Sequence, residues 1–255
     1  MIAALGMYDR PELRSETDGF WALIRDGLRA QGMAAPETLT RDDRAWMAGW
    51  LSPDLLLSQT CGLPFRARLQ GHVALVGTPD FGVEGCPPGY YCSVLICRAD
   101  LPPPALEDLP RLRFAFNEGL SQSGWAAPLA HLQARGLTLR PSLASGGHRA
   151  SALAVADGRA DWAALDAVTW RLLLQHEPAL AQRLQVVDRT VPTPGLPYVT
   201  AAGRDPEPIR AAVQAAITAL PAADRAALGL RGLVQIPAAA YLALPVPPLP
   251  VLQAD

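Results

Sequence analysis

The chain has 255 residues, of which 50% are hydrophobic and 18% are charged, and its formal net charge is −2. This is enough apolar material for one large domain or two small ones. Its arginines are scattered, which argues against the clustered basic face of a nucleic-acid-binding protein, and no apolar run approaches the ~18 residues of a membrane span.

In the first third of the chain, short apolar segments alternate with an amphipathic segment. The expected strands are residues 1–7, 37–40, 54–58 and 73–76, and the expected helix is 18–31, capped by Thr17 or Asp18. This alternation predicts a largely parallel sheet that is covered by helices on both faces. The rhythm stops after Gly77, and the glycines and prolines of residues 78–89 predict a loop or crossover.

A second α/β series follows this crossover. The expected strands are residues 90–98, 112–116, 137–140, 161–165, 184–188 and 198–202. The expected helices are residues 125–135, 147–157, 167–176, 206–219 and 222–228. Three prolines and a glycine predict a second crossover at residues 191–197, and the proline-rich segment 245–250 is expected on the surface.

Two α/β series with two crossovers predict two lobes. Residues 1–78 and 198–255 form the expected first lobe, residues 90–190 form the second, and residues 79–89 and 191–197 are the hinge segments. Ligands in such folds bind beyond the carboxyl ends of the strands, so we expect the site in the cleft between the lobes.

The most informative segment is Glu118–Trp125, which lies between an expected strand and an expected helix. The N–H groups at a helix start point toward a ligand, and the helix dipole favours negative charge there. Ser121 and Ser123 can add hydroxyl donors without adding charge, and together with Gly124 they build an anion cradle at this turn. The alternative is a plain helix N-cap, a position where serine is preferred.

Other polar residues follow expected strands in the same way. They are Tyr8 and Asp9, the segment Ser58–Thr60, the segment Ser145–His148, and Asp166. Because strand ends converge on one cleft, these positions predict a shared site. Each also has a simpler interpretation, since His148 can merely begin a helix and Asp166 can cap the next one. Tyr8 and Tyr91 belong either to the core or to the wall of the cleft.

Ser123, His148 and Asp166 include the residue types of a hydrolase triad. The Gly-x-Ser-x-Gly nucleophile pattern is absent, however, and the chain order differs from that of hydrolases with this architecture. We therefore expect a ligand-binding protein without catalytic residues, while the hydrolase interpretation stays open as the less favoured one. An enzyme would depend on His148 as its base.

The four cysteines do not predict a metal site. None of Cys61, Cys86, Cys92 and Cys97 forms a Cys-x-x-Cys pair, so we expect neither zinc nor another cofactor. Buried thiols are favoured. A Cys86–Cys92 disulfide across the intervening turn is the alternative in an oxidising compartment.

With these residues identified, the chain resembles the phosphonate-binding family of periplasmic-type solute-binding proteins, which serve ABC importers. The resemblance covers roughly residues 1–230. It rests on Pro53–Gln59, Gly77–Pro79, Tyr90–Val94, Ser121–Gly124, Gly147–His148 and Gly158–Asp166. Each segment is a weak signal by itself, but their combination in this order is fairly specific.

The resemblance implies an α/β, two-lobed, type II periplasmic-binding-protein-like fold, in which each lobe is a mostly parallel sheet flanked by helices. It implies that the Ser-x-Ser-Gly turn grips a phosphonate or phosphate, and that Asp166 selects the substituent. Gln122 stands where the family often has another hydroxyl residue. The ligand-binding residues expected in this way are Tyr8, Ser58, Gln59, Thr60, Tyr91, Ser121, Gln122, Ser123, Gly124, His148 and Asp166.

The predicted function is that of a monomeric solute-binding protein of an ABC importer, with a permease and an ATPase as partners. Its ligand would be a phosphonate, a phosphate or a phosphate ester. The alternative is a cytoplasmic sensor or enzyme with the same fold, for a thiamine-precursor-like or sulfonate ligand. The first residues lack the features of a signal peptide, so a periplasmic location is expected if an export signal was trimmed or lies upstream, and a cytoplasmic one otherwise.

Overall fold

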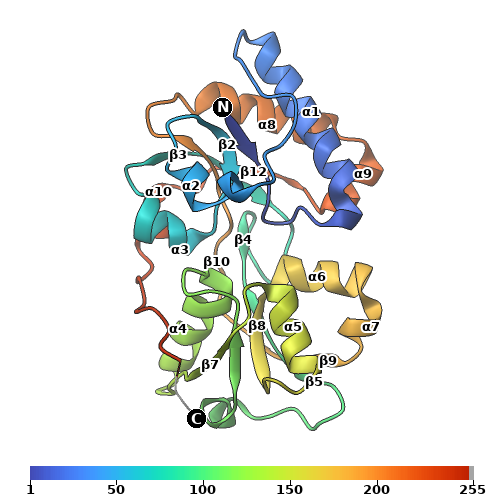
Figure 1. Cartoon of the computed structure of the whole chain (residues 1–255), viewed down its shortest axis with the longest axis vertical. Coiled ribbons are helices and arrows are strands. Elements are labelled where there is room, and N and C mark those ends of the chain that lie inside the picture. Colours follow the sequence, from blue (N-terminus) through green and yellow to red (C-terminus); the bar gives the residue numbers. More distant parts are fainter. Residues whose placement is uncertain (253–255) are drawn as a thin grey trace. The chain divides into compact units, whose positions relative to one another are not determined.

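The computed structural model describes residues 1–252, and its contacts divide the chain into two compact units. Unit 1 comprises Met1–Tyr90 and Pro194–Leu244. Unit 2 comprises Tyr91–Thr193 and the C-terminal segment that begins at Pro245. Each unit is a sheet flanked by helices, which confirms the predicted α/β class (Figure 1).

The sheet of unit 1 has five strands in the order β1-β2-β11-β3-β12. Their bounds are Ile2–Ala4 for β1, Leu55–Gln59 for β2, Tyr198–Ala201 for β11, Val73–Asp80 for β3 and Gly232–Val234 for β12. Strands β1 and β2 are parallel, β11 is antiparallel to both β2 and β3, and β12 is antiparallel to β3. The sheet is therefore mixed, because β11 and β12 come from the part of the chain that returns from unit 2.

Two core clusters hold the helices of unit 1 on its sheet. Helices α1 (Arg14–Ala30) and α8 (Glu207–Ala219) pack against each other (Figure 1). The buried positions of α1 recur at helical spacing, so one stripe of the helix enters the core. The second cluster joins α2 (Met47–Trp50) to the buried Tyr241 of α10 (Ala238–Leu242).

Short segments complete unit 1. They are the turns Pro11–Leu13 (η1) and Asp43–Ala45 (η2), the segment α3 (Gly62–Pro64) with the π-turn η3 (Phe65–Leu69), and helix α9 (Ala222–Leu228). The two-stranded ladder of β4 (Tyr90–Tyr91) and β10 (Thr193–Pro194) lies where the chain passes between the units.

The sheet of unit 2 has the order β7-β6-β8-β5-β9. The bounds are Pro141–Ala144 for β7, Phe114–Phe116 for β6, Trp162–Asp166 for β8, Ser93–Arg98 for β5 and Leu184–Arg189 for β9. Strands β6, β7 and β8 run parallel, and β5 is antiparallel to β8 and β9. This sheet is also mixed, whereas the sequence led us to expect mostly parallel strands in each lobe.

Helices flank this second sheet. They are α4 (Ala127–Gln133), α5 (His148–Ala156), α6 (Ala167–His176) and α7 (Pro178–Ala181), and the 3-10 segment η4 (Leu106–Arg111) precedes β6. Alternation along the strands decides which side chains meet which helix. Phe114, Phe116 and Trp162 form one core cluster with Leu129 and Leu132 of α4.

The structure corrects several predicted elements. Residues 37–40 form no strand, although Thr40 N donates one hydrogen bond to Ala3 O at 2.7 Å. The strand expected at 137–140 lies instead at Pro141–Ala144, and β3 continues to Asp80 inside the expected loop. Strand β12 and helix α10 were not predicted, because the apolar segments that form them are too short to show a clear period.

The C-terminal segment also differs from the prediction, which placed all of residues 198–255 in the first lobe. Trp125 Nε1 donates to Pro248 O at 2.9 Å, and a Cβ atom at Gly119 would lie 2.9 Å from Pro250 Cδ. Residues 245–252 therefore pack on unit 2. Residues 253–255 lie outside the described part of the chain.

Within residues 1–252, no helix is both long enough and apolar enough to cross a bilayer. All four cysteines are reduced thiols, so the Cys86–Cys92 alternative is not formed in this structure.

Candidate functional site

Most of the predicted site residues of unit 2 lie at one edge of its sheet. Strands β6, β7 and β8 are parallel neighbours, so their carboxyl ends share that edge. The segments that leave these strands carry Ser121–Gly124, His148 and Asp166. Ser145 N donates to Phe116 O and Gly146 N donates to Asn117 O, at 2.8 and 2.9 Å, so the β7 turn is fastened to the end of β6.

The turn after β6 begins a helix that starts in π form. Ser121 is the N-cap of η5 (Gln122–Ala126), which continues directly into α4. The Ser121 Oγ atom accepts a hydrogen bond from Gly124 N at 2.9 Å. Ser121 is therefore a helix cap, as the simpler interpretation predicted. Ser121, Gln122 and Ser123 are each only 3% exposed, which is unusual for a polar helix start and sets this turn apart from a solvated cap.

Glycine suits position 124 because neighbouring side chains approach its backbone closely, not because of its backbone angles. A Cβ atom at this position would lie 1.8 Å from Asn117 Oδ1 and 3.2 Å from His148 Cε1. Asn117, directly after β6, is a site residue that the sequence analysis missed. Its Oδ1 atom is buried and has no hydrogen-bond partner within the described part of the chain. A ligand that donates a hydrogen bond would satisfy it.

Ser123 and His148 form the central contact of the site. Their Oγ and Nε2 atoms are 2.8 Å apart. His148 is the first residue of α5, so the turn after β7 places its ring against the turn after β6. The Nδ1 atom of His148 is buried. Burial lowers the pKa of His148, whereas the charge of Asp166 and the backbone of Ala164 raise it by less. The imidazole is therefore neutral at pH 7.

Asp166 ends β8 and caps α6. Its Oδ1 atom accepts hydrogen bonds from Val168 N at 2.7 Å and from Thr169 N at 3.0 Å. The side chain is 3% exposed and supplies negative charge to this edge of the sheet. The capping interpretation of Asp166 is thus correct, and its carboxylate still lies close enough to influence the imidazole of His148.

Ser93 is a second residue that the sequence analysis missed. It pairs with Asp166 across the β5–β8 ladder, and its Oγ atom donates to Ser123 O at 2.8 Å. This bond ties the first turn of η5 to the start of β5. Only the antiparallel pairing of β5 and β8 brings Ser93 to this edge, so no local sequence signal could have identified it.

The predicted residues of unit 1 are held by structural hydrogen bonds. Trp50 Nε1 donates to Ser58 Oγ at 3.0 Å, and Gln59 Nε2 donates to Leu196 O at 3.1 Å. Thr60 lies just beyond β2, and its N–H donates to Pro197 O at 3.1 Å. All three side chains are buried. Ser58 and Gln59 therefore act at least in part as core residues of unit 1.

The two predicted tyrosines lie in different units. Tyr8 follows β1, is partly exposed and packs edge-on against Phe81, with ring centroids 5.0 Å apart. Tyr91 is 3% exposed and opens unit 2 in β4. Arg66 in η3, which follows β2 and α3, is a buried cation that the sequence analysis missed, and it is 8% exposed. Its burial could not be read from the short, irregular segment that contains it.

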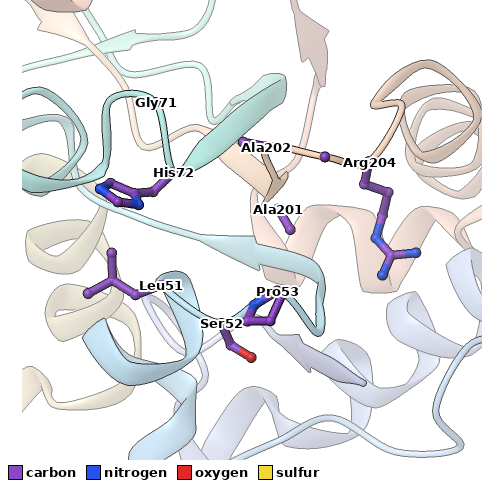
Figure 2. A pocket seen from close by; sticks show the side chains of 9 residues that line it. Leu51, Ser52, Pro53, Gly71, His72, Ala201, Ala202 and Arg204 are labelled. Carbon is purple, nitrogen blue, oxygen red and sulfur yellow. The ribbon is translucent and has the colours of Figure 1, made fainter.

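Unit 1 also contains a cavity of about 510 Å³. Figure 2 shows that it is built from the turns that precede β2 and β3 and from the turn that follows β11. It is lined by Leu51, Ser52, Pro53, Gly71, His72, Ala201, Ala202, Gly203 and Arg204. None of the predicted site residues lines this cavity, which lies at the edge of the sheet opposite to Thr60.

The geometry does not form a hydrolytic triad. In a triad, the carboxylate accepts a hydrogen bond from the histidine nitrogen that faces away from the serine. Here His148 Nδ1 bonds no carboxylate, and Asp166 Oδ1 receives the two backbone N–H groups of its own helix. The described residues also contain no cluster of three or more His, Cys, Asp or Glu side chains that could hold a metal ion.

A comparison with known protein families shows the family to which the chain belongs. Residues 49–240 match the family described as the phosphonate ABC transporter, periplasmic substrate-binding protein. The chain belongs to this family. Its members are substrate-binding proteins rather than enzymes, and they are periplasmic components of ABC importers. The resemblance inferred from the sequence is therefore confirmed, and the hydrolase alternative is rejected.

Solved structures share the two-unit fold. PhnD1 from Prochlorococcus marinus, in complex with methylphosphonate, is 20% identical with a TM-score of 0.68, and the match covers 89% of this chain and 90% of that one. A Xanthomonas citri protein bound to ATP is 17% identical with a TM-score of 0.69, covering 91% and 92%. A binding protein component of a Pseudomonas aeruginosa ABC phosphonate transporter is 17% identical with a TM-score of 0.68, covering 91% and 80%. No curated protein matches the chain.

Proposed function

We propose that this protein binds a small oxyanion, namely a phosphonate, a phosphate or a phosphate ester, for an ABC importer. The observation that carries the proposal is the contact between the buried Ser123, in the first turn of the η5–α4 helix, and the partly buried His148 at the start of α5. The first N–H groups of a helix have no carbonyl partner within that helix, and they point toward an anion placed beyond its end. Hydroxyl groups add further donors without the cost of burying a cation.

The remaining residues of unit 2 define what surrounds the oxyanion. Gln122 adds an amide to the turn, and Asp166 places a carboxylate at the same edge. A carboxylate repels a second negative charge and favours an amine or hydroxyl on the ligand. The proposal is therefore a singly anionic head with a substituent that donates hydrogen bonds. Tyr91 serves as apolar contact area with a polar tip.

Unit 1 supplies the second set of contacts in this proposal. We assign it Tyr8 and the segment Ser58–Thr60, of which Tyr8 is partly exposed and the segment is buried. Contacts from two units that differ between open and closed states would make the ligand stabilise the closed state. The loaded protein would then meet a permease and its ATPase as a monomer in the periplasm.

A matched pair of serine variants tests the site. Ser123→Ala removes the hydroxyl at the centre, and we expect weaker methylphosphonate binding by about 1–2 kcal/mol, or ~5–30-fold, as for a hydrogen bond to a charged group. Ser145→Ala is the control, because the Ser145 hydroxyl is already shared with Gly147 O at 3.0 Å and Ser151 Oγ at 2.7 Å. Titration calorimetry gives both dissociation constants.

Two outcomes would contradict the proposal at different levels. Equal affinities for the wild type and Ser123→Ala would remove Ser123 from the site. A thermal-shift screen against inorganic phosphate, phosphite, methylphosphonate, 2-aminoethylphosphonate and sulfonates tests the ligand class. A ligand at 100 times its dissociation constant adds about 2.7 kcal/mol of stability. A melting temperature that none of these compounds raises would reject the oxyanion ligand.

A further inference from the structure

The proline-rich segment near the C-terminus packs on the protein with one of its edges. In residues 244–250 the half-buried positions are Leu244, Pro247 and Pro250, and the four positions between them are exposed. A period of three residues is that of the polyproline II helix, which prolines favour and which makes no internal hydrogen bonds. The segment is therefore a stiff, extended stretch of chain that rests on its neighbours along one side.

This segment contacts the turn Ser121–Gly124 on both sides. Before the turn, a Cβ atom at Gly119 would lie 2.9 Å from Pro250 Cδ. After the turn, Trp125 Nε1 donates a hydrogen bond to Pro248 O at 2.9 Å. Pro248, Pro250 and the leucine between them thus form a clasp around the serine turn.

The hydrogen bond to the clasp comes from inside the π-form start of the helix. Trp125 belongs to η5, in which Ala126 N donates to Ser121 O at 3.1 Å. This form is rare in proteins and is frequent at functional sites. Trp125 is 4% exposed, and its ring packs against Phe116 with centroids 5.7 Å apart. A buried indole N–H needs an acceptor, so loss of Pro248 O would make the ring and its π-turn rearrange.

The clasp is held in place by an anchor at its other end. Tyr241 of α10 is fully buried in unit 1, and its hydroxyl oxygen lies 2.6 Å from Thr78 Oγ1. Pro248 lies only seven residues further along the chain. The contact of the clasp is therefore intramolecular, with a high effective concentration, and the stiff prolines have little chain entropy to lose on docking. A contact made by three residues can persist under these conditions.

We propose that the clasp is a positioning element of the oxyanion site, which holds the π-turn in the form that aims Ser123 and the N–H groups of the helix start at the ligand. This inference rests on the proposed function and adds a regulation of that site. Seating of the clasp and binding of the ligand are then coupled equilibria, and each strengthens the other by the same factor. The affinity of unit 2 thereby depends on a segment that unit 1 anchors.

Substitutions in the clasp test the coupling without changing the serine turn. Leu249→Ala combined with Pro250→Ala removes the side-chain atoms that lie closest to Gly119. The matched control is Val251→Ala combined with Leu252→Ala, at positions that are 78% and 51% exposed. We expect the clasp variant to bind methylphosphonate about fivefold more weakly, as for the weaker of known couplings between sites, and the control to bind like the wild type. Titration calorimetry measures this, and wild-type affinity in the clasp variant would overturn the inference.

A substitution on the other side of the contact gives an independent test. Gly119→Ala places a methyl group against the clasp, whereas Gly203→Ala, in a turn of unit 1, meets nothing within 4 Å. Neither glycine has a left-handed backbone, so alanine fits the backbone of both. We expect weaker methylphosphonate binding in Gly119→Ala and unchanged binding in Gly203→Ala. Equal affinities of these two variants would contradict the role of the clasp.

The response of the clasp to ligand separates positioning from a purely structural role. In protein with ¹⁵N-labelled tryptophan, NMR measures how fast the Trp125 indole N–H exchanges with water, and Trp125→Phe assigns its signal among the six tryptophans. We expect saturating methylphosphonate to slow this exchange, whereas a clasp that only stabilises unit 2 would exchange equally with and without ligand. Ligand binding that leaves the exchange unchanged would overturn the inference but not the proposed function. A wild type that binds no oxyanion would reject both.

Discussion

The polar side chains at the edge of the unit 2 sheet serve the fold and the proposed site together. Ser121 caps a helix with its oxygen, and that bond leaves its hydroxyl proton for another acceptor. Asp166 caps α6 through Oδ1 and also acts on the pKa of His148. For these two residues, the simple and the functional interpretations are therefore compatible. Both interpretations depend on the same hydrogen-bonding groups at a helix start, and the sequence reveals these groups.

His148 gives a pH dependence to the stability of the ligand-free protein. Its folded-state pKa lies below the 6.5 of a free imidazole, because burial disfavours the charged form. Below pH 6.5 the unfolded chain therefore binds more protons than the folded chain at this residue, and stability falls as pH falls toward the folded pKa. Above pH 6.5 both states are neutral there, and this residue adds no pH dependence.

We expect the His148→Gln variant to lose the part of the pH dependence of stability that His148 causes. Glutamine can face Ser123 with an amide, but it cannot titrate. Urea unfolding at pH values from 5 to 8 measures the slope. His72→Gln is the control, because His72 is exposed. An identical slope in the wild type and His148→Gln would show that the imidazole is protonated equally in both states.

Among the elements, the β6–η5 turn contains a glycine that two side chains approach closely. A Cβ atom at Gly124 would lie 1.8 Å from Asn117 Oδ1, so a side chain there would displace the Asn117 side chain. The serines and the glycine were predicted to form this turn, because helix starts have a strong local signature. Its π form and its contact with Asn117 were not predicted, since both depend on how η5 seats against the end of β6.

Two glycines in this region are expected to differ in their response to substitution by alanine. Gly124→Ala would drive a methyl group into Asn117, and we expect a loss of about 1–3 kcal/mol, as for an overpacked core, together with weaker methylphosphonate binding. Gly147→Ala meets nothing within 4 Å and has an extended backbone, so we expect little change. Urea unfolding measures the stability of both variants, and calorimetry measures their methylphosphonate binding. Equal stability of the two variants would contradict the close approach.

At the level of the whole chain, three connections join the two units. The sequence predicted the two near residues 79–89 and 191–197, from their prolines and glycines. The third follows α10, where Tyr241 is fully buried in unit 1 and its hydroxyl lies 2.6 Å from Thr78 Oγ1. Seven residues later, Pro248 accepts the hydrogen bond from Trp125 in unit 2. The exact lobe boundaries stay a prediction, apart from this reassignment of the tail.

The third connection is testable through one hydrogen bond. Trp125→Phe keeps an aromatic ring but removes the N–H that binds Pro248 O, and we expect about 1 kcal/mol of lost stability and faster amide exchange in residues 245–252. Trp46→Phe, at an exposed tryptophan of unit 1, is the control. Thermal melting and hydrogen exchange followed by mass spectrometry report both effects. A tail that exchanges as slowly in Trp125→Phe as in the wild type would show that this bond does not hold it.

The sequence by itself determined the α/β class, the alternation of elements in unit 2, and the serine turn with His148 and Asp166. These features are encoded by neighbouring residues, through periodicity and helix-start chemistry. Only the tertiary structure decided the mixed sheets, the pairing of Ser93 with Asp166, the commitment of Ser58 to Trp50 and the seating of the tail on Trp125. These contacts join residues that are distant along the chain or depend on strand order, and burial of the two cores selects them. The secondary-structure propensity of a short segment indicates neither its distant contacts nor the order of the strands.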